Sequence, residues 1–178
     1  MRIVSGKYKS RRINAPKNLP TRPTTDIAKE ALFNVLNNNY YFEDISVLDL
    51  FAGIGSISLE FASRGTEHII SVDNHYPCVK FIESTAKDLG AEISVIKSDA
   101  FKFIEKSSLK VDVIFADPPY DLSDEQFLTL STTVFENELL NENGMLIIEH
   151  SKHTDLSNNP HFSYLKKYGG SVFSFFES

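Results

Sequence analysis

Short apolar segments alternate with helical patterns along most of the chain, and this alternation constrains the fold more than any other feature. We expect strands at residues 46–51, 68–72, 93–97, 111–116, 145–149, 164–168 and 171–176. Helices of about ten residues separate the first five, which indicates crossover connections and a parallel sheet covered on both faces. The last two flank Gly169-Gly170 and are expected to form an antiparallel hairpin at one edge. The sequence therefore predicts an α/β protein with a mostly parallel, seven-stranded sheet.

Capping residues indicate where several helices begin and end, and we expect helices at residues 26–36, 56–63, 77–89, 101–105 and 123–135. Thr25 is expected to cap the first helix, with Asp26 in its first turn, and Gly90 to end the third. Ser123 and Gln126 have the spacing of a capping box. The first helix is expected to bury an apolar face made of Ile27, Ala28, Ala31, Leu32, Val35 and Leu36.

The charge balance differs between the start of the chain and the rest. Residues 1–22 contain seven basic and no acidic residues, while the remainder has 11 basic and 24 acidic ones, for a net charge of −6. We expect a short basic, β-rich arm at residues 1–22 and one domain at residues 23–178. Such an arm favours a nucleic-acid partner, because Lys and Arg that neutralise phosphates release counterions. The alternative interpretation of these basic residues is a solvated pair of strands with no nucleic-acid partner.

Composition excludes several protein classes. The chain is 42% hydrophobic and 24% charged, which is too apolar for a disordered protein. Its single cysteine, Cys78, cannot form an intramolecular disulfide. No apolar run approaches the roughly 18 residues of a membrane helix, and residues 1–20 lack the apolar stretch of a signal peptide. We therefore expect a cytoplasmic protein with no membrane partner.

Acidic residues follow three of the expected strands, where ligands bind in parallel sheets. Asp49 ends the first strand, before a turn in which Gly53 and Gly55 let the backbone approach a ligand. The third glycine of a pyrophosphate-binding fingerprint is missing. Asp73 lies 20 residues beyond Gly53, the offset of an acid that binds ribose hydroxyls. Asp99 follows the third strand and could meet an adenine amino group or only cap a helix. Together these residues indicate a site for a nucleoside without phosphates.

The fourth strand ends in Asp117-Pro118-Pro119-Tyr120, the most specific motif of the chain. The two prolines fix the backbone and lack amide hydrogens, so the Pro118 carbonyl is free to point into a site. A carboxylate and a carbonyl held together match the two hydrogens of an amino group, and Tyr120 offers a face on which a base can stack. A proline-terminated strand and turn is the alternative interpretation.

Two motifs make the chain resemble S-adenosylmethionine-dependent methyltransferases that act on an exocyclic or amide nitrogen. They are Asp-x-Phe-x-Gly-x-Gly at residues 49–55 and Asp-Pro-Pro-Tyr at residues 117–120. Two further segments narrow the resemblance to one family. They are the basic arm, Arg2-Ile3-Val4-Ser5-Gly6-Lys7-Tyr8, and the segment Thr21-Arg22-Pro23-Thr24-Thr25-Asp26. With these segments included, the chain more closely resembles the bacterial small-subunit ribosomal RNA guanine-N2 methyltransferases of the RsmD type. The chain departs from that pattern at Ile54, where Ser is usual, and at Ile27, where Arg is usual.

The resemblance implies a Rossmann-like class I methyltransferase fold and methyl transfer from S-adenosylmethionine to the N2 amino group of a guanine in 16S rRNA. The substrate would be the small ribosomal subunit or an assembly intermediate, and the enzyme a monomer that needs no metal. The implied methyl-donor site comprises Asp49, Phe51, Gly53, Gly55, Asp73, Asn74, Asp99 and Ala100. The implied catalytic residues are Asp117, Pro118 and Tyr120, and the RNA-binding residues of the arm are Lys7, Lys9, Arg11, Arg12 and Arg22.

Other functions remain open at this point. The substrate could be adenine N6 in RNA or DNA, or a glutamine N5 of a protein, and the chain could be an RNA-binding protein without activity. Pro77-Cys78 matches the pair used in pyrimidine methylation, but it lies away from the fourth strand, so we interpret Cys78 as a small apolar residue. We interpret His150 and His153 as surface histidines, because two histidines beside Glu149 make a poor metal site.

Overall fold

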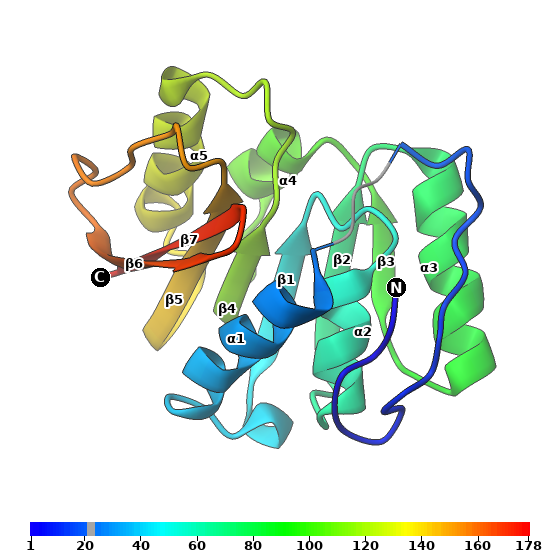
Figure 1. The fold of residues 1–178 in the computed structure, drawn as a ribbon. Coiled ribbons are helices and arrows are strands. Elements are labelled where there is room, and N and C mark those ends of the chain that lie inside the picture. The colour runs from blue at the N-terminus through cyan, green and yellow to red at the C-terminus, as the bar shows by residue number, and fades with distance from the viewer. Residues whose placement is uncertain (21–23) are drawn as a thin grey trace.

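The computed structural model describes residues 1–20 and 24–178. Its seven-stranded sheet has the order β3-β2-β1-β4-β5-β7-β6 (Figure 1). The strands are β1 Ser46–Leu50, β2 His68–Asp73, β3 Ser94–Lys97, β4 Val111–Ala116, β5 Leu140–His150, β6 Phe162–Tyr168 and β7 Ser171–Glu177. Strands β1 to β5 pair in parallel, while β7 pairs antiparallel with both β5 and β6. The predicted parallel sheet and its antiparallel edge hairpin are confirmed.

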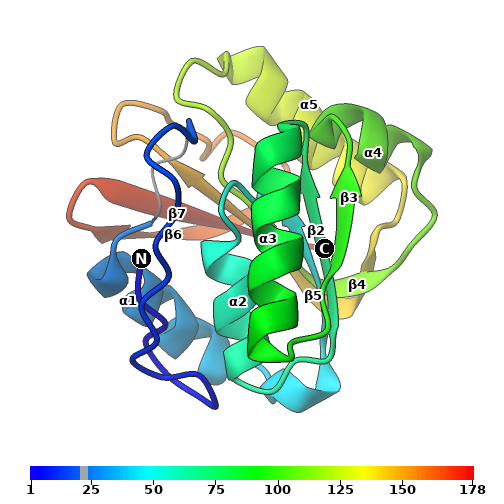
Figure 2. The same cartoon turned by 90° about the vertical axis from the view of Figure 1, so that its right-hand side faces the viewer.

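Among the described residues, five α-helices cover the sheet: α1 Asp26–Asn37, α2 Ser56–Ser63, α3 Tyr76–Leu89, α4 Ala100–Lys106 and α5 Asp124–Glu136. Helices α1, α2 and α3 lie on one face, and α4 and α5 on the other (Figure 2). A 3-10 turn at Phe42–Asp44 precedes β1. Buried Leu, Ile, Val and Phe side chains fill both interfaces, so the sheet is apolar on both sides. No helix in the part of the chain that the structure describes is long and apolar enough to cross a membrane.

The expected capping interactions are present. The Thr25 side chain accepts a hydrogen bond from the Ala28 amide at 3.3 Å at the start of α1. Both bonds of the capping box between Ser123 and Gln126 form at the start of α5. Gly90 ends α3 with a φ of 67°. These helix boundaries were predictable because each cap satisfies backbone groups that the helix itself leaves unpaired.

The expected apolar face of α1 was wrong at Ile27, which is 77% exposed. The nearby Lys29 is fully buried instead. Its ammonium group donates to the Arg2 carbonyl at 2.6 Å and forms an ion pair with Glu60 at 3.5 Å. A buried charge needs such partners, and only the tertiary fold supplies them here.

The basic arm packs along α2 as an irregular segment. Within its described residues, 1–20, the β structure is one isolated bridge between Arg2 and Arg12, so this part of the arm is less β-rich than expected. Ile3, Tyr8 and Ile13 are buried in a cluster with Leu59 of α2. The arm is therefore docked on the domain by apolar contacts, while most of its charges face outward.

Candidate functional site

The glycine turn leaves the carboxyl end of β1 in a conformation that few residues adopt. Phe51, Gly53 and Gly55 have φ values of 58°, 56° and 76°. A Cβ atom on Gly55 would lie 2.9 Å from Cγ1 of Ile82 on α3, so a side chain at this position would collide with that helix. The turn therefore depends on glycine for its backbone conformation and for its close packing against α3.

Asp49 lies beneath this turn and is only 2% exposed. Its carboxylate accepts hydrogen bonds from the amide of Ser58, at 3.1 Å, and from the Ser58 hydroxyl. That hydroxyl also contacts the hydroxyl of Ser71 on β2 at 2.6 Å. Burial raises the pKa of Asp49 to about 7, although the bonds from Ser58 act in the opposite direction. Ser58, which stands where a pyrophosphate fingerprint has glycine, thus connects α2 to Asp49.

Asp73 stands at the end of β2 with both carboxylate oxygens turned toward backbone amides. Its Oδ2 accepts from the Gly53 amide at 2.8 Å, and its Oδ1 accepts from the His75 amide at 2.8 Å. The contact with Gly53 joins the end of the second strand to the glycine turn. Asn74, beside it, is exposed.

Asp99 caps α4, because its Oδ1 accepts from the Lys102 amide at 3.0 Å. The helix-cap alternative is therefore correct for one of its oxygens. Ala100, the first residue of α4, is buried. Phe101 packs edge-on against Phe51, with ring centroids 6.0 Å apart, so the glycine turn and the start of α4 are in contact.

Asp117 follows β4 directly, and Glu149 lies near the end of β5. Ala116 pairs with Ile148 in parallel register, so the two acidic residues are neighbours across the strands. Burial raises the pKa of Asp117 well above its usual range, and the charges of Glu149 and Asp49 raise it further. Pro118 is buried and Tyr120 is 62% exposed. The motif thus places the carboxylate of Asp117 at the carboxyl end of the parallel strands and the ring of Tyr120 at the surface.

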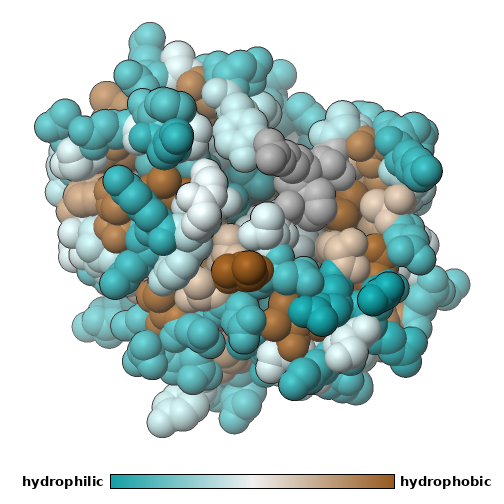
Figure 3. Space-filling view, viewed as in Figure 1, coloured by the Kyte–Doolittle hydropathy of each residue, from teal (hydrophilic) through white to brown (hydrophobic). Residues whose placement is uncertain are grey.

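A cavity of about 660 Å³ opens beside this motif. Tyr120 and Glu149 line it, together with Thr24, Thr25, Ile27, Ser151, Lys152, His153, Tyr168, Gly169, Gly170 and Ser171. Figure 3 shows the face viewed in Figure 1 as mostly hydrophilic with small apolar patches. The Tyr120 ring and Ile27 give the cavity apolar surface, and Glu149 gives it a carboxylate. This combination suits a planar ligand with hydrogen-bond donors.

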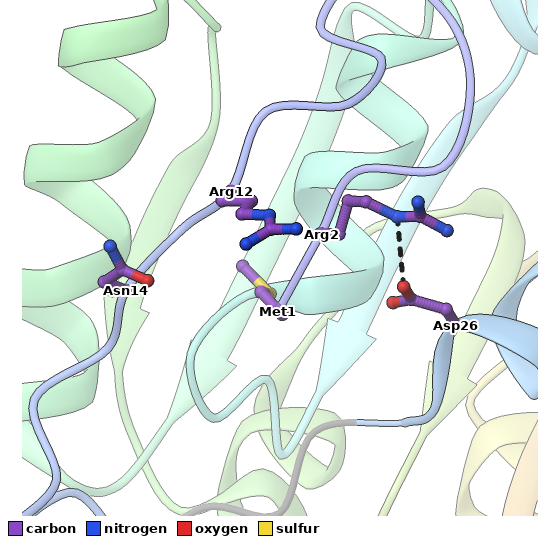
Figure 4. A pocket seen from close by; sticks show the side chains of 5 residues that line it. All are labelled: Met1, Arg2, Arg12, Asn14 and Asp26. Atoms are coloured by element: carbon purple, nitrogen blue, oxygen red, sulfur yellow. Dashed lines mark hydrogen bonds and ion pairs between the residues drawn. The ribbon is translucent and has the colours of Figure 1, made fainter.

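A second cavity, of about 460 Å³, lies between the arm and α1, where Arg2 forms an ion pair with Asp26 at 3.1 Å (Figure 4). Met1, Arg12 and Asn14 also line it. Among the residues predicted to bind RNA, Lys7, Lys9, Arg11 and Arg12 are exposed. Arg22, the fifth of them, lies outside the described residues, as does the rest of the segment at 21–23.

Cys78 and His150 were expected to have no catalytic or metal-binding role. Cys78 is buried, and burial raises the pKa of its thiol to about 11, as fits a small apolar residue. His150 was wrongly expected at the surface: it is 3% exposed, and its Nε2 lies 2.7 Å from the Ser174 hydroxyl of β7. Within residues 1–20 and 24–178, no three His, Cys, Asp or Glu side chains are grouped as metal ligands.

The model of a protein family described as Conserved hypothetical protein 95 matches residues 1–177. The chain belongs to this family. YlbH of Bacillus subtilis is 35% identical over 161 residues, which cover 88% of this chain and 85% of YlbH. The protein of Escherichia coli K12 named ribosomal RNA small subunit methyltransferase D is 30% identical over 151 residues, covering 84% of this chain and 71% of the relative.

The fold of this Conserved hypothetical protein 95 member also matches solved structures. A hypothetical protein of Thermus thermophilus superposes with a TM-score of 0.86 at 24% identity, over 100% of this chain and 99% of that one. The sheet order, with β7 between β5 and β6, is that of class I methyltransferases, as the resemblance implied. Sequence reasoning missed Glu149 and Thr24 as cavity residues, because their meeting depends on the pairing of β5 with β4 and β7.

Proposed function

We propose that this protein transfers a methyl group from S-adenosylmethionine to the exocyclic N2 amino group of a guanine in 16S rRNA. The observation that carries the proposal is the position of Asp117-Pro118-Pro119-Tyr120 at the end of β4, the strand between β1 with its glycine turn and β5 with Glu149. Tyr120 and Glu149 line the same cavity. Membership of the Conserved hypothetical protein 95 family and the rRNA methyltransferase among its relatives support it.

The strand ends of β1, β2 and β3 fit the methyl donor chemically. Gly53 and Gly55 keep the turn free of side chains, and Asp73 sits against that turn as an acceptor for ribose hydroxyls. Asp99 has a second oxygen for an adenine amino group, because its Oδ1 alone accepts the cap bond from Lys102. Phe51, Asn74 and Ala100 complete the proposed methyl-donor site. A sulfonium ligand would stabilise the ionised form of Asp49, whose pKa burial raises. When bound, S-adenosylmethionine supplies an electrophilic methyl group.

The residues at the end of β4 would orient the target. Asp117 and the Pro118 carbonyl accept hydrogen bonds from the two hydrogens of the guanine amino group, which turns the nitrogen lone pair toward the methyl-donor site. As the N–C bond forms and the methyl–sulfur bond breaks, the nitrogen loses one of these hydrogens as a proton. Tyr120 stacks on the base, a contact worth about 1 to 3 kcal/mol. The rate gain comes from positioning and from the negative carboxylate next to the charge that develops on nitrogen. A base in a loop suits this site, because it leaves its stack easily.

Lys7, Lys9, Arg11, Arg12 and Arg22 of the arm would hold the RNA backbone. Lys7, Lys9, Arg11 and Arg12 are exposed on an arm that its buried Ile3, Tyr8 and Ile13 hold on the domain. Positive charges in this arrangement attract phosphates without reading sequence. Specificity would then come from the cavity beside Tyr120.

The test is methyl transfer by wild-type protein and Asp117→Ala to small-subunit particles from a strain that lacks the enzyme. We expect Asp117→Ala to lose at least about 100-fold in rate, while it still binds RNA and S-adenosylmethionine. Asp121→Ala, an exposed carboxylate four residues on, is the matched control and should keep wild-type activity. Wild-type activity in Asp117→Ala would refute the assigned role.

A further inference from the structure

Glu149 is a buried carboxylate that faces the cavity and has no assigned role. It is 4% exposed and stands beside Asp117 in the parallel register of β4 and β5. The Thr24 hydroxyl donates to its Oε2 at 2.9 Å, which fixes the side chain from the segment that precedes α1. The Ser171 side chain, at the start of β7, is a second hydrogen-bond partner, and the bonds from Ser171 and Thr24 both oppose the rise in the pKa of Glu149. The carboxylate as a whole borders the cavity.

Asp117 is half-buried and Glu149 is buried. Two carboxylates so close together are unfavourable, because each disfavours the charge of the other. Burial raises the pKa of Glu149, and its charge in turn raises the pKa of Asp117. A ligand that donates a hydrogen bond to each carboxylate would relieve this repulsion. The pair therefore suits a ligand with two donors side by side.

Guanine has such an edge, with the N1 hydrogen next to the N2 amino group. Adenine presents an acceptor at N1 and has no amino group at C2. A carboxylate is an acceptor only, so it bonds to the N1 hydrogen of guanine and repels the N1 lone pair of adenine. A site built to receive a hydrogen bond rejects analogues that lack the donor, because its buried polar group is then left unpaired.

We propose that Glu149 accepts a hydrogen bond from N1 of the target guanine while Asp117 holds its amino group. This assignment rests on the proposed function and makes Glu149 a specificity-determining residue. The two neighbouring carboxylates then read the edge of one base, and Tyr120 covers its face. Thr24 acts through Glu149 as a positioning residue, since it contacts the carboxylate directly.

The test compares kcat/KM for two RNA fragments around the guanine that the wild-type enzyme modifies. One fragment carries guanine, and the other carries 2-aminopurine, which keeps the 2-amino group but has an acceptor at N1. We expect the wild-type enzyme to prefer guanine by about 100-fold or more. Glu149→Gln should lower that preference at least about tenfold, because its amide can turn and donate to N1 of 2-aminopurine.

Glu142→Gln is the matched control, because Glu142 lies at the opposite, exposed end of the same strand. It should keep the wild-type preference. An unchanged preference in folded Glu149→Gln would overturn the assignment. Should that variant fail to fold, equal methylation of guanine and 2-aminopurine by the wild-type enzyme would overturn it alone. Methylation of adenine or protein by the wild-type enzyme would instead refute the proposed function.

Discussion

Gly6→Ala should detach the arm from the domain, because Gly6 lies directly against the end of α2. Its φ is 81°, and a Cβ atom there would stand 1.8 Å from the Ser63 carbonyl oxygen and 2.3 Å from the carbonyl carbon. Both atoms are backbone, so no side chain can move aside. The neighbouring Lys7 amide donates to the same carbonyl at 2.6 Å, and the Tyr8 amide donates to the Ser63 hydroxyl at 2.9 Å.

The magnitude follows from these contacts. The left-handed conformation costs an alanine about 1 to 2 kcal/mol. Each hydrogen bond lost from the docked arm removes about 1 kcal/mol. We therefore expect Gly6→Ala to weaken arm docking by about 3 to 4 kcal/mol.

Limited trypsin digestion measures the effect, because Arg11 and Arg12 lie in the arm. Gly6→Ala should be cut there at least about tenfold faster than wild type, since cleavage follows the open population. Gly90→Ala is the control: its φ is also positive, at 67°, but no atom lies within 4 Å of the added Cβ. It should leave arm cleavage unchanged. Wild-type cleavage of Gly6→Ala would refute the docking account.

Two further predictions concern charge. Replacing both Arg11 and Arg12 by Ala should weaken RNA binding and lower its salt slope by about 1 per arginine, with donor affinity unchanged; equal loss of donor binding would make the arm structural. For Asp49, the pKa in the folded protein is about 7, above the 3.8 of an unperturbed aspartate. Its contribution to stability is therefore full below about pH 4 and is lost as pH rises through about 7. Asp49→Asn should therefore abolish about 4 kcal/mol of this pH dependence in urea unfolding; parallel wild-type and variant curves would contradict it.

The fold was largely predictable because its signals are local. The boundaries of α5 follow from the capping box at Ser123, and the end of α3 follows from Gly90. Continuous apolar segments identified the buried strands, with β4 predicted at its observed bounds. The glycine turn and the carboxylates after three strands met at one sheet edge because parallel strands share that edge.

The rest depended on tertiary partners that no local pattern reveals. Ile27 fits the apolar period of α1 but borders the cavity, while Lys29 is buried because Glu60 and the arm surround it. Strand β5 starts five residues before the apolar segment that predicted it, since pairing with β4 extends it through polar residues. Glu149 became a site residue only through the register of β5 beside β4.

The assignment of N2-guanine methylation in 16S rRNA is tested most directly by identifying the methylated product. Small-subunit particles, large-subunit particles, DNA and protein from a strain lacking the enzyme are offered together with a labelled methyl donor, and the products are digested and separated. The account predicts label in 16S rRNA as N2-methylguanosine. Label in N6-methyladenosine or in methylglutamine would contradict it.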